Sequence, residues 1–241
     1  MDFTELRHLA EQIETECGKA IIGKGEQIRL VLTSLFAGGH VLIDDIPGVG
    51  KTTLVKALSA VLGCGMVRVQ FTPDLLPSDV TGLNFFDRKA GDFVFSPGPV
   101  FCSILLADEI NRATPRTQSA LLECMAEGQV TVDGVTRRLE PPFFVIATQN
   151  PVETLGTYPL PEAQLDRFLL RISMDMPTKA QERQILERFQ DSEPPGVPGT
   201  GVLQRADCGA AGRGAEGLYP PRAAGLHGGP GPCLPADAGG R

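Results

Sequence analysis

The chain lacks long hydrophobic runs, a recognisable leader segment and paired cysteine motifs. No stretch of about 18 consecutive apolar residues occurs among its 241 residues, so no segment is predicted to span a membrane. The N-terminal segment is acidic and amphipathic, which is not the pattern of a signal peptide. The six cysteines are scattered and form no C-x-x-C pair. This usage favours reduced, buried thiols in a cytoplasmic protein.

Basic residues are outnumbered by acidic ones. The chain has 22 Lys and Arg against 29 Asp and Glu, which gives a net charge of −7 and a pI of about 5.0. This balance argues against a nucleic-acid-binding surface that covers the molecule, although a local basic patch stays open. A hydrophobic content of 42% and a charged content of 21% are typical of a globular protein. The length allows one good-sized domain and a second small one.

The strongest signal is the stretch 41–56, VLIDDIPGVGKTTLVK. An apolar run, a glycine-rich turn and a helical pattern follow one another here. This order predicts a phosphate-binding loop, because glycines let backbone N–H groups turn toward an anion. Lys51 would reach the β- and γ-phosphates, and the Thr52 hydroxyl would hold Mg²⁺. Asp45 stands where the full motif has glycine, and an ordinary glycine-rich turn is the alternative interpretation.

An acidic pair ends a second apolar run, SILLADEINRA at 103–113. Asp108 would hold the hydration shell of Mg²⁺, and Glu109 would orient and deprotonate the attacking water. Many strands end in acids, so this pattern alone is weak. Its position 57 residues after Lys51 (108 − 51 = 57), with a strand between, strengthens the hypothesis.

Two further polar residues follow apolar segments. Asn150, in FFVIATQNP, can bridge the γ-phosphate and the water, whereas the alternative is an Asn-Pro turn. Arg167, in LPEAQLDRF, carries a fixed charge and a forked set of donors. Supplied by a neighbouring subunit, it would stabilise charge on the transferring phosphate. The alternative for Arg167 is a salt bridge to Asp166 or Glu162.

Alternating strands and helices predict an α/β fold with a parallel sheet, whose carboxyl ends carry the candidate residues. The expected strands are 40–44, 66–71, 104–107, 143–148 and 168–174. The expected helices are 3–17, 26–37, 51–62, one from about 115, 161–167 and one from 178. Residues 72–103 are predicted to be an insertion with its own hairpin, built from 83–86 and 92–95. A second hairpin is expected at 129–139, around Asp133 and Gly134.

These stretches, in this order, resemble the AAA+ ATPases, and the residues within the motifs are most similar to those of the MoxR family. The resemblance runs from about residue 15 to 190 and is carried by IIGKGEQI, GHVLIDDIPGVGKTTL, RVQFTPDLLPSDVTG, GPVFCSILLADEINRATPRTQSALLECMAEGQVTVDG and FFVIATQNPVETLGTYPLPEAQLDRF. An acidic pair before the Pro-Gly turn is usual in that family, which accommodates Asp45. The resemblance implies a P-loop NTPase fold with a five-stranded parallel sheet. It also implies an insertion in the second helix (73–98) and a hairpin before the sensor strand (129–139), both facing the central pore of a ring.

The resemblance also implies ATP and Mg²⁺ as cofactors and a role for each candidate residue. Glu109 would be the residue that activates the water, Asn150 the first sensor and Arg167 the arginine finger. The implied metal residues are Thr52 and Asp108. The implied nucleotide contacts are Ile22, Gly23, Pro47, Gly48, Val49, Gly50, Lys51, Thr52 and Thr53, with Ile22 and Gly23 beside the adenine.

The sequence divides into three expected regions. Residues 1–176 form the AAA+ nucleotide-binding core, and 177–193 form the first helix of a helical lid that is otherwise mostly missing. Residues 194–241 hold 13 of the 28 glycines and 8 of the 20 prolines, and they show no apolar periodicity. Such a segment is predicted to be disordered. A frame-shifted reading of a GC-rich gene, in place of the remaining lid and its second sensor arginine, is a further hypothesis.

The leading functional interpretation is a MoxR-like ATPase. It would couple ATP binding and hydrolysis to chaperone-like remodelling, assembly or metal-cofactor activation of client protein complexes. Given a lid, it would form a homo-oligomeric ring, a hexamer, and work with a von Willebrand factor A domain protein. One alternative is a nucleic-acid or chelatase motor subunit. Another is a nucleotide-binding module without turnover.

Overall fold

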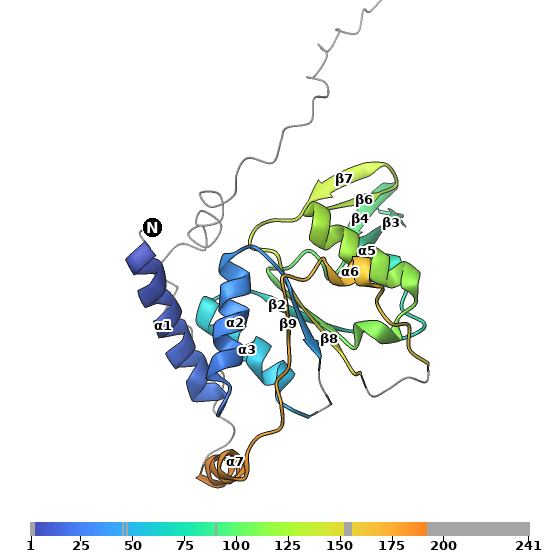
Figure 1. The fold of residues 1–241 in the computed structure, drawn as a ribbon. Coiled ribbons are helices and arrows are strands. Elements are labelled where there is room, and N and C mark those ends of the chain that lie inside the picture. Colours follow the sequence, from blue (N-terminus) through green and yellow to red (C-terminus); the bar gives the residue numbers. More distant parts are fainter. Residues whose placement is uncertain (1–2, 45, 47, 90, 152–155, 192–241) are drawn as a thin grey trace, which may run out of the picture.

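A five-stranded parallel sheet forms the centre of the molecule, with the strand order β2-β5-β8-β1-β9 (Figure 1). The structure is a computed structural model that describes residues 3–44, 46, 48–89, 91–151 and 156–191. The strands are β1 (Val41–Asp44), β2 (Met66–Gln70), β5 (Ile104–Asp108), β8 (Phe144–Gln149) and β9 (Leu170–Ile172). The predicted α/β fold of the P-loop type is confirmed.

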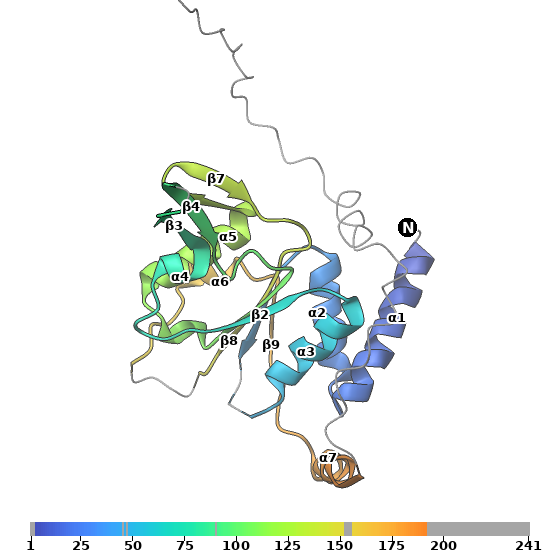
Figure 2. The same cartoon turned by 180° about the vertical axis from the view of Figure 1, so that it is seen from behind.

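Helices cover both faces of this sheet (Figures 1 and 2). One layer holds α1 (Phe3–Ala20), α2 (Gly25–Phe36) and α3 (Lys51–Leu62), and the other holds α5 (Pro115–Glu127). Alternate side chains of β1 serve the two layers, with Val41 and Ile43 in one core and Leu42 in the other. Strands buried on both faces are apolar throughout. Ligands are therefore left with the carboxyl ends of the strands.

Two hairpins extend from the α5 side of the sheet, as predicted. The first follows α4 (Pro77–Thr81) and pairs β3 (Gly82–Asp87) with β4 (Asp92–Pro97). The second pairs β6 (Gln129–Val132) with β7 (Val135–Arg138). Its turn residues Asp133 and Gly134 have φ of 50° and 78°, the left-handed geometry that a tight two-residue turn requires.

The two hairpins contact each other. Asn84 Nδ2 donates to Asp133 Oδ2 at 2.7 Å. The guanidinium of Arg137 lies 3.7 Å from the centroid of the Phe95 ring. The insertion and the second hairpin are thus joined by a polar bond and a cation–π contact.

His40 connects three elements at the amino end of β1. Its Nδ1 accepts from the Val145 N–H at 3.1 Å, and its Nε2 lies 3.3 Å from the carbonyl oxygen of Met125. These partners place the ring proton on Nε2, because a backbone N–H can only donate and a carbonyl can only accept. The side chain is 7% exposed. Burial lowers the pKa of His40, and the bond to Met125 opposes that shift.

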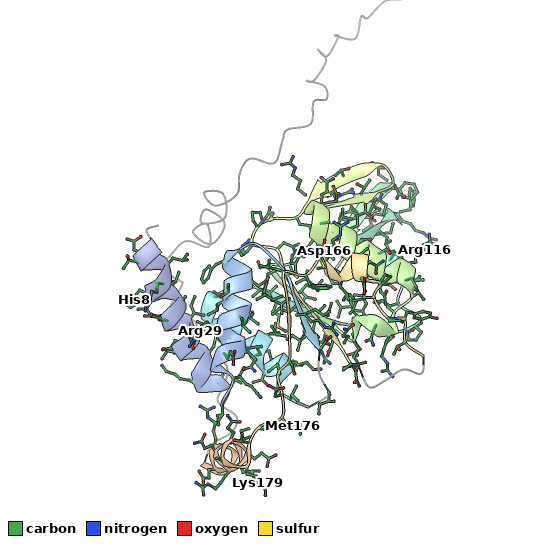
Figure 3. All side chains as sticks on the ribbon, in the orientation of Figure 1. His8, Arg29, Arg116, Asp166, Met176 and Lys179 are labelled. Atoms are coloured by element: carbon green, nitrogen blue, oxygen red, sulfur yellow. The ribbon has the colours of Figure 1, made fainter. Side chains whose placement is uncertain are left out.

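The turn between α1 and α2 holds the segment that leads from the sheet to α7 (Lys179–Asp191). Lys24 is 5% exposed and donates to the carbonyl of Met174 and, at 3.0 Å, to that of Asp175. Arg188 of α7 donates to the carbonyl of Lys19 at the end of α1. Figure 3 labels Met176 on this segment and Lys179 at the start of α7. A helix is thus present where the first lid helix was expected, and the predicted tail, 194–241, lies outside the described residues.

Several boundaries differ from the prediction. The last strand is shorter than 168–174, because the Phe168 N–H donates to the Leu165 carbonyl in the turn after α6 (Glu162–Leu165). Helix α1 continues to Ala20, past the expected end at 17. The helix α4 and the short 3₁₀ helix η1 (Ile110–Arg112) were not predicted, since such short elements show no apolar periodicity.

Buried thiols are present, as the scattered cysteines suggested. Burial raises the pKa of Cys17 to about 12 and that of Cys124 to about 12, so both thiols stay protonated at neutral pH. Within the described part of the chain, the helices are too short or too polar to cross a bilayer.

Candidate nucleotide-binding site

The glycine-rich turn and the start of α3 form an open anion cradle. Gly48 and Gly50 have φ of 91° and 92°, a left-handed conformation that glycine adopts without steric cost. Apart from each glycine's own chain neighbours, no heavy atom of the described residues lies within 4 Å of the position that a Cβ would take at either residue. Helix α3 begins at Lys51. The Leu54 N–H donates to the Gly50 carbonyl at 3.0 Å, the bond that closes the first turn of the helix. The start of an α-helix generally presents N–H groups that the helix itself does not bond, and such a start is a common place for a phosphate.

Within this loop, the structure places most of the predicted residues together. Val49 is buried and anchors the turn in the core, whereas Lys51 and Thr52 are half-buried in the first turn of α3. Thr53 is exposed. Pro47, which was also predicted to contact nucleotide, lies outside the described residues, as does Asp45.

Thr148 on β8 connects the two acidic residues that end β5. Its hydroxyl donates to Asp108 Oδ1 at 2.6 Å and accepts from the Glu109 N–H at 2.9 Å. Glu109 has φ 56° and ψ 50°, a left-handed conformation that is uncommon for a residue with a side chain. This backbone strain sits at the predicted water-activating residue, which is where functional strain is often found.

Two arginines and one glutamine contact the acidic pair. Arg68 Nη2 lies 2.7 Å from Asp108 Oδ2, and Arg112 Nη1 lies 3.0 Å from Glu109 Oε2. Gln70 Nε2 donates to the same Glu109 oxygen at 2.7 Å. The two carboxylates are therefore matched by two guanidinium groups.

Asn150 follows β8 at the same edge of the sheet. Its carbonyl accepts a bond of 3.3 Å from Asn111 Nδ2, and the Asn111 carbonyl accepts from the Tyr158 N–H at 2.6 Å. Asn111 is 7% exposed, and it links the turn after Glu109 to the loop after Asn150. The predicted sensor position is therefore fastened to the acidic turn through the backbone.

Arg167 lies in the turn after α6. Its N–H donates to the Gln164 carbonyl at 3.2 Å, and its side chain is exposed. Its guanidinium forms no ion pair with Asp166, Glu162 or any other acid among the described residues. Figure 3 labels Asp166 at this turn.

Ile22 and Gly23 occupy the turn between α1 and α2, next to the first residues of α7. Gly23 has φ 73°, and the side chain of Gln181 packs so closely on it that a Cβ there would overlap the amide group. Ile22 is half-buried. The turn expected to lie beside the adenine is therefore in direct contact with α7.

The oxygen donors at this edge fit Mg²⁺. A hydroxyl at Thr52 and a carboxylate at Asp108 are the hard ligands that this ion prefers. The described residues contain no group of three or more His, Cys, Asp or Glu that could hold a metal by themselves. A Mg²⁺ ion here would take its remaining ligands from water and from phosphate oxygens, as it usually does beside nucleotides.

The sequence patterns missed Arg68, Gln70, Arg112 and Thr148. The available signal for the first two was polar residues at alternate positions of an otherwise apolar strand, MVRVQ. Which strand lies beside β2 decides what these side chains meet, and that pairing is a tertiary property. Gln70 is the register partner of Asp108.

Comparisons with known proteins agree with this geometry. Residues 40–170 match the family described as "ATPase family associated with various cellular activities (AAA)". Chaperone MoxR1 of Mycobacterium tuberculosis is 43% identical over 187 residues, 78% of this chain and 50% of that protein. Protein MoxR of Methylorubrum extorquens is 37% identical over 198 residues, 79% of this chain and 57% of that protein.

A solved structure is also similar. The crystal structure of a candidate ATPase from Cytophaga hutchinsonii superposes with a TM-score of 0.71 at 43% identity, covering 79% of this chain and 58% of the other. The chain thus spans between half and three-fifths of the length of these relatives. On the family match, the related sequences and the shared fold, the chain belongs to the MoxR family of AAA+ ATPases.

Proposed function

We propose that this chain binds ATP with Mg²⁺ at the carboxyl edge of its sheet and hydrolyses the terminal phosphoanhydride. The observation that carries the proposal is the Thr148 hydroxyl, which holds Asp108 and Glu109 at the end of β5. The open glycine cradle at the end of β1 lies at the same edge, because β1 and β5 flank β8 in parallel. ATP hydrolysis needs N–H groups that donate hydrogen bonds to phosphate and a pair of acids, placed on neighbouring strand ends.

Each residue has a proposed role. Backbone N–H groups of 48–53 and the Lys51 ammonium hold the phosphates, and Pro47 completes the loop. Thr52 and Asp108 would hold Mg²⁺, and the ion would supply positive charge to balance the phosphates. Ile22 and Gly23 contact the adenine.

In the chemical step we assign to Glu109 the role of general base, which accepts the proton of the attacking water. Its carboxylate takes a proton from water as the water oxygen bonds to the γ-phosphorus and the bond to the β-phosphate oxygen breaks. Asn150 bridges the water and the γ-phosphate. In the structure Glu109 Oε2 is occupied by Gln70 and Arg112, so the carboxylate must loosen at least one of these contacts to reach water.

We assign the arginine finger to Arg167, acting on the nucleotide of a neighbouring subunit in a ring, which we take to be a hexamer. Its guanidinium is exposed and forms no ion pair with any residue that the structure describes, which supports a role in trans. A finger of this kind contributes about 10³–10⁵ to the rate in related systems.

The work done with ATP is proposed to be chaperone-like remodelling, assembly or metal-cofactor activation of client complexes in the cytoplasm, with a von Willebrand factor A domain protein as partner. Two observations support this class. The relative from Mycobacterium tuberculosis is named a chaperone. The hairpin β3–β4 exposes Phe86 and Phe93, which are 54% and 68% exposed. Aromatic side chains on a loop that faces a ring pore suit contact with polypeptide.

The described contacts of the β6–β7 hairpin do not favour the nucleic-acid motor. Arg137 sits on the hairpin where such a motor would need a basic tip, but its guanidinium is stacked on Phe95. Asp133 at the tip accepts from Asn84, which places a carboxylate at the turn.

The test is ATP turnover together with nucleotide binding, measured on three proteins purified alike. We expect Glu109→Gln to keep binding and lose turnover by about 10²–10⁴. Lys51→Ala is expected to lose binding itself. If the natural chain turns over no faster than the Glu109→Gln protein, it is a binding module without turnover, and the proposal is wrong.

A further inference from the structure

The edge strand β2 brings two side chains over the acidic pair. Arg68 and Gln70 are two residues apart, so they project from the same face of the strand. The register pairs Gln70 with Asp108 and Arg68 with Leu106 on β5. Neither residue belongs to the glycine loop or to the strand ends that carry the predicted chemistry.

Their hydrogen bonds form a continuous chain from one acid to the other. Arg68 Nε and Nη2 both donate to Asp108 Oδ2, at 3.1 and 2.7 Å. The same Nη2 donates to Gln70 Oε1 at 3.0 Å. Gln70 Nε2 then donates to Glu109 Oε2 at 2.7 Å. Asp108 and Glu109 are therefore linked through Arg68 and Gln70 on this side and through Thr148 on the other.

The Asp108 carboxylate has little capacity left for a metal in this arrangement. Oδ1 accepts from Thr148, and Oδ2 accepts twice from Arg68. A Mg²⁺ ion or its hydration shell also needs acceptor oxygens from this carboxylate. The guanidinium is a permanent cation, so an approaching divalent ion would also be repelled by it.

The side chain of Arg68 can move away from Asp108 into solvent more easily than Asp108 can move. Its side chain is 48% exposed, whereas that of Asp108 is 14% exposed. A long side chain on an edge strand can swing toward solvent, but the aspartate is held by Thr148. Ion pairs of such exposure are weak, so a divalent ion at millimolar concentration can replace one.

We propose that Arg68 is a positioning residue that takes the place of the metal's positive charge in the metal-free site, and that Mg²⁺ must displace it. Displacement also removes the Arg68 bond to Gln70, and Gln70 is one of the two residues, with Arg112, that donate to Glu109 Oε2. Metal binding at Asp108 would therefore change the hydrogen bonds of Glu109 through the side chains of Arg68 and Gln70 on β2. This inference rests on the proposed ATP site.

The experiment is a Mg²⁺ titration of the binding of a fluorescent, non-hydrolysable ATP analogue to the full chain. Arg68→Gln removes the competing cation, so we expect half-saturation at an Mg²⁺ concentration lower by about two- to five-fold. Arg68→Lys keeps the charge and should return the midpoint toward that of the natural chain. Arg116→Gln is the matched control, since Arg116 is exposed on α5 (Figure 3) and belongs to none of the hydrogen bonds of the acidic pair.

A double-mutant cycle tests the connection to Glu109. If Arg68 and Gln70 act as one chain, Arg68→Gln with Gln70→Met should shift the midpoint no further than Arg68→Gln alone. Fully additive shifts would overturn the connection. Mn²⁺ binding followed by electron paramagnetic resonance, with circular dichroism of each variant, gives a second measurement that does not depend on turnover.

The outcomes separate the two proposals. An unchanged or raised Mg²⁺ midpoint in Arg68→Gln overturns the displacement of Arg68, even when nucleotide binds normally. Equal weakening of nucleotide binding at every Mg²⁺ concentration would mean that Arg68 simply attracts phosphate. Failure of the natural chain to bind the analogue, with no effect of Lys51→Ala, would instead overturn the ATP site itself.

Discussion

The Thr148 hydroxyl donates a hydrogen bond of 2.6 Å to Asp108 Oδ1 across the pairing of β8 with β5. Because the same oxygen accepts from the Glu109 N–H, one side chain fixes both the carboxylate and the backbone of the acidic pair. Thr148 is fully buried, so water cannot replace it. Residues that orient a metal-binding group in this way are often as necessary as the group itself.

Thr148→Val should therefore impair the site while preserving the shape of the core. We expect a loss of about 1–3 kcal/mol in the free energy of unfolding, because a buried acceptor and a buried donor lose their partner. ATP turnover should fall by about 10- to 100-fold. Thr148→Ser retains the hydroxyl and is the control. Unchanged turnover in Thr148→Val, measured by phosphate release, would contradict the positioning role.

The left-handed backbone of Glu109 predicts an inverted order of two substitutions. Glu109→Gly and Glu109→Ala both remove the carboxylate, but only glycine adopts φ 56° without cost. Glu109→Gly should be more stable than Glu109→Ala by about 1 kcal/mol in urea unfolding. At Glu123, which is exposed within α5, alanine should instead be the more stable by about 1 kcal/mol. Equal stabilities at Glu109 would mean that its backbone relaxes.

His40 predicts how stability changes with pH. Its pKa in the folded protein is lowered from the ordinary value of 6.5, so the unfolded chain takes up the proton first as pH falls. The contribution of His40 to the free energy of unfolding should be fully present above pH 6.5. Below that pH the free energy of unfolding should decrease, with a limiting slope of about 1.4 kcal/mol per pH unit. Urea unfolding at several pH values measures the slope.

A matched variant isolates this contribution. His8 is exposed on α1 and points away from the sheet (Figure 3), so His8→Gln should keep the slope. His40→Gln should reduce it, although the protein is less stable overall. A slope that survives in His40→Gln would have to come from the carboxylates.

Arg167 predicts complementation between two inactive subunits. Arg167→Ala and Lys51→Ala should each abolish turnover alone, since one lacks the finger and the other the phosphate lysine. Mixed rings contain interfaces in which both residues are intact, about a quarter of them at equal amounts. We expect turnover to reappear on mixing and to peak near equal amounts. No recovery at any ratio, in rings shown by light scattering to be mixed, would exclude action in trans.

The sequence predicted the parts of the site that lie on one continuous segment. The glycine loop with Lys51 and the end of β5 with Asp108 are each read from a few neighbouring residues, and their strand–turn–helix context is local. Arg68 and Gln70 could not be found in this way, because their partners lie about 40 residues away in the sequence and are reached through the pairing of β2 with β5. The early end of β9 was missed for the same reason: a lysine in the turn between α1 and α2 uses the Met174 carbonyl.

The bonds of Lys24 have a consequence for how a nucleotide signal could leave the core. One ammonium group, 5% exposed, fastens the turn proposed to contact the base to the carbonyls just before α7. Any tilt of that turn is therefore passed to the beginning of the following helix over the length of a single side chain. With methionine at position 24 these two carbonyls would lose their shared donor, and the packing of Gln181 on Gly23 and the bond from Arg188 to Lys19 would be left to connect the turn and the end of α1 to the helix.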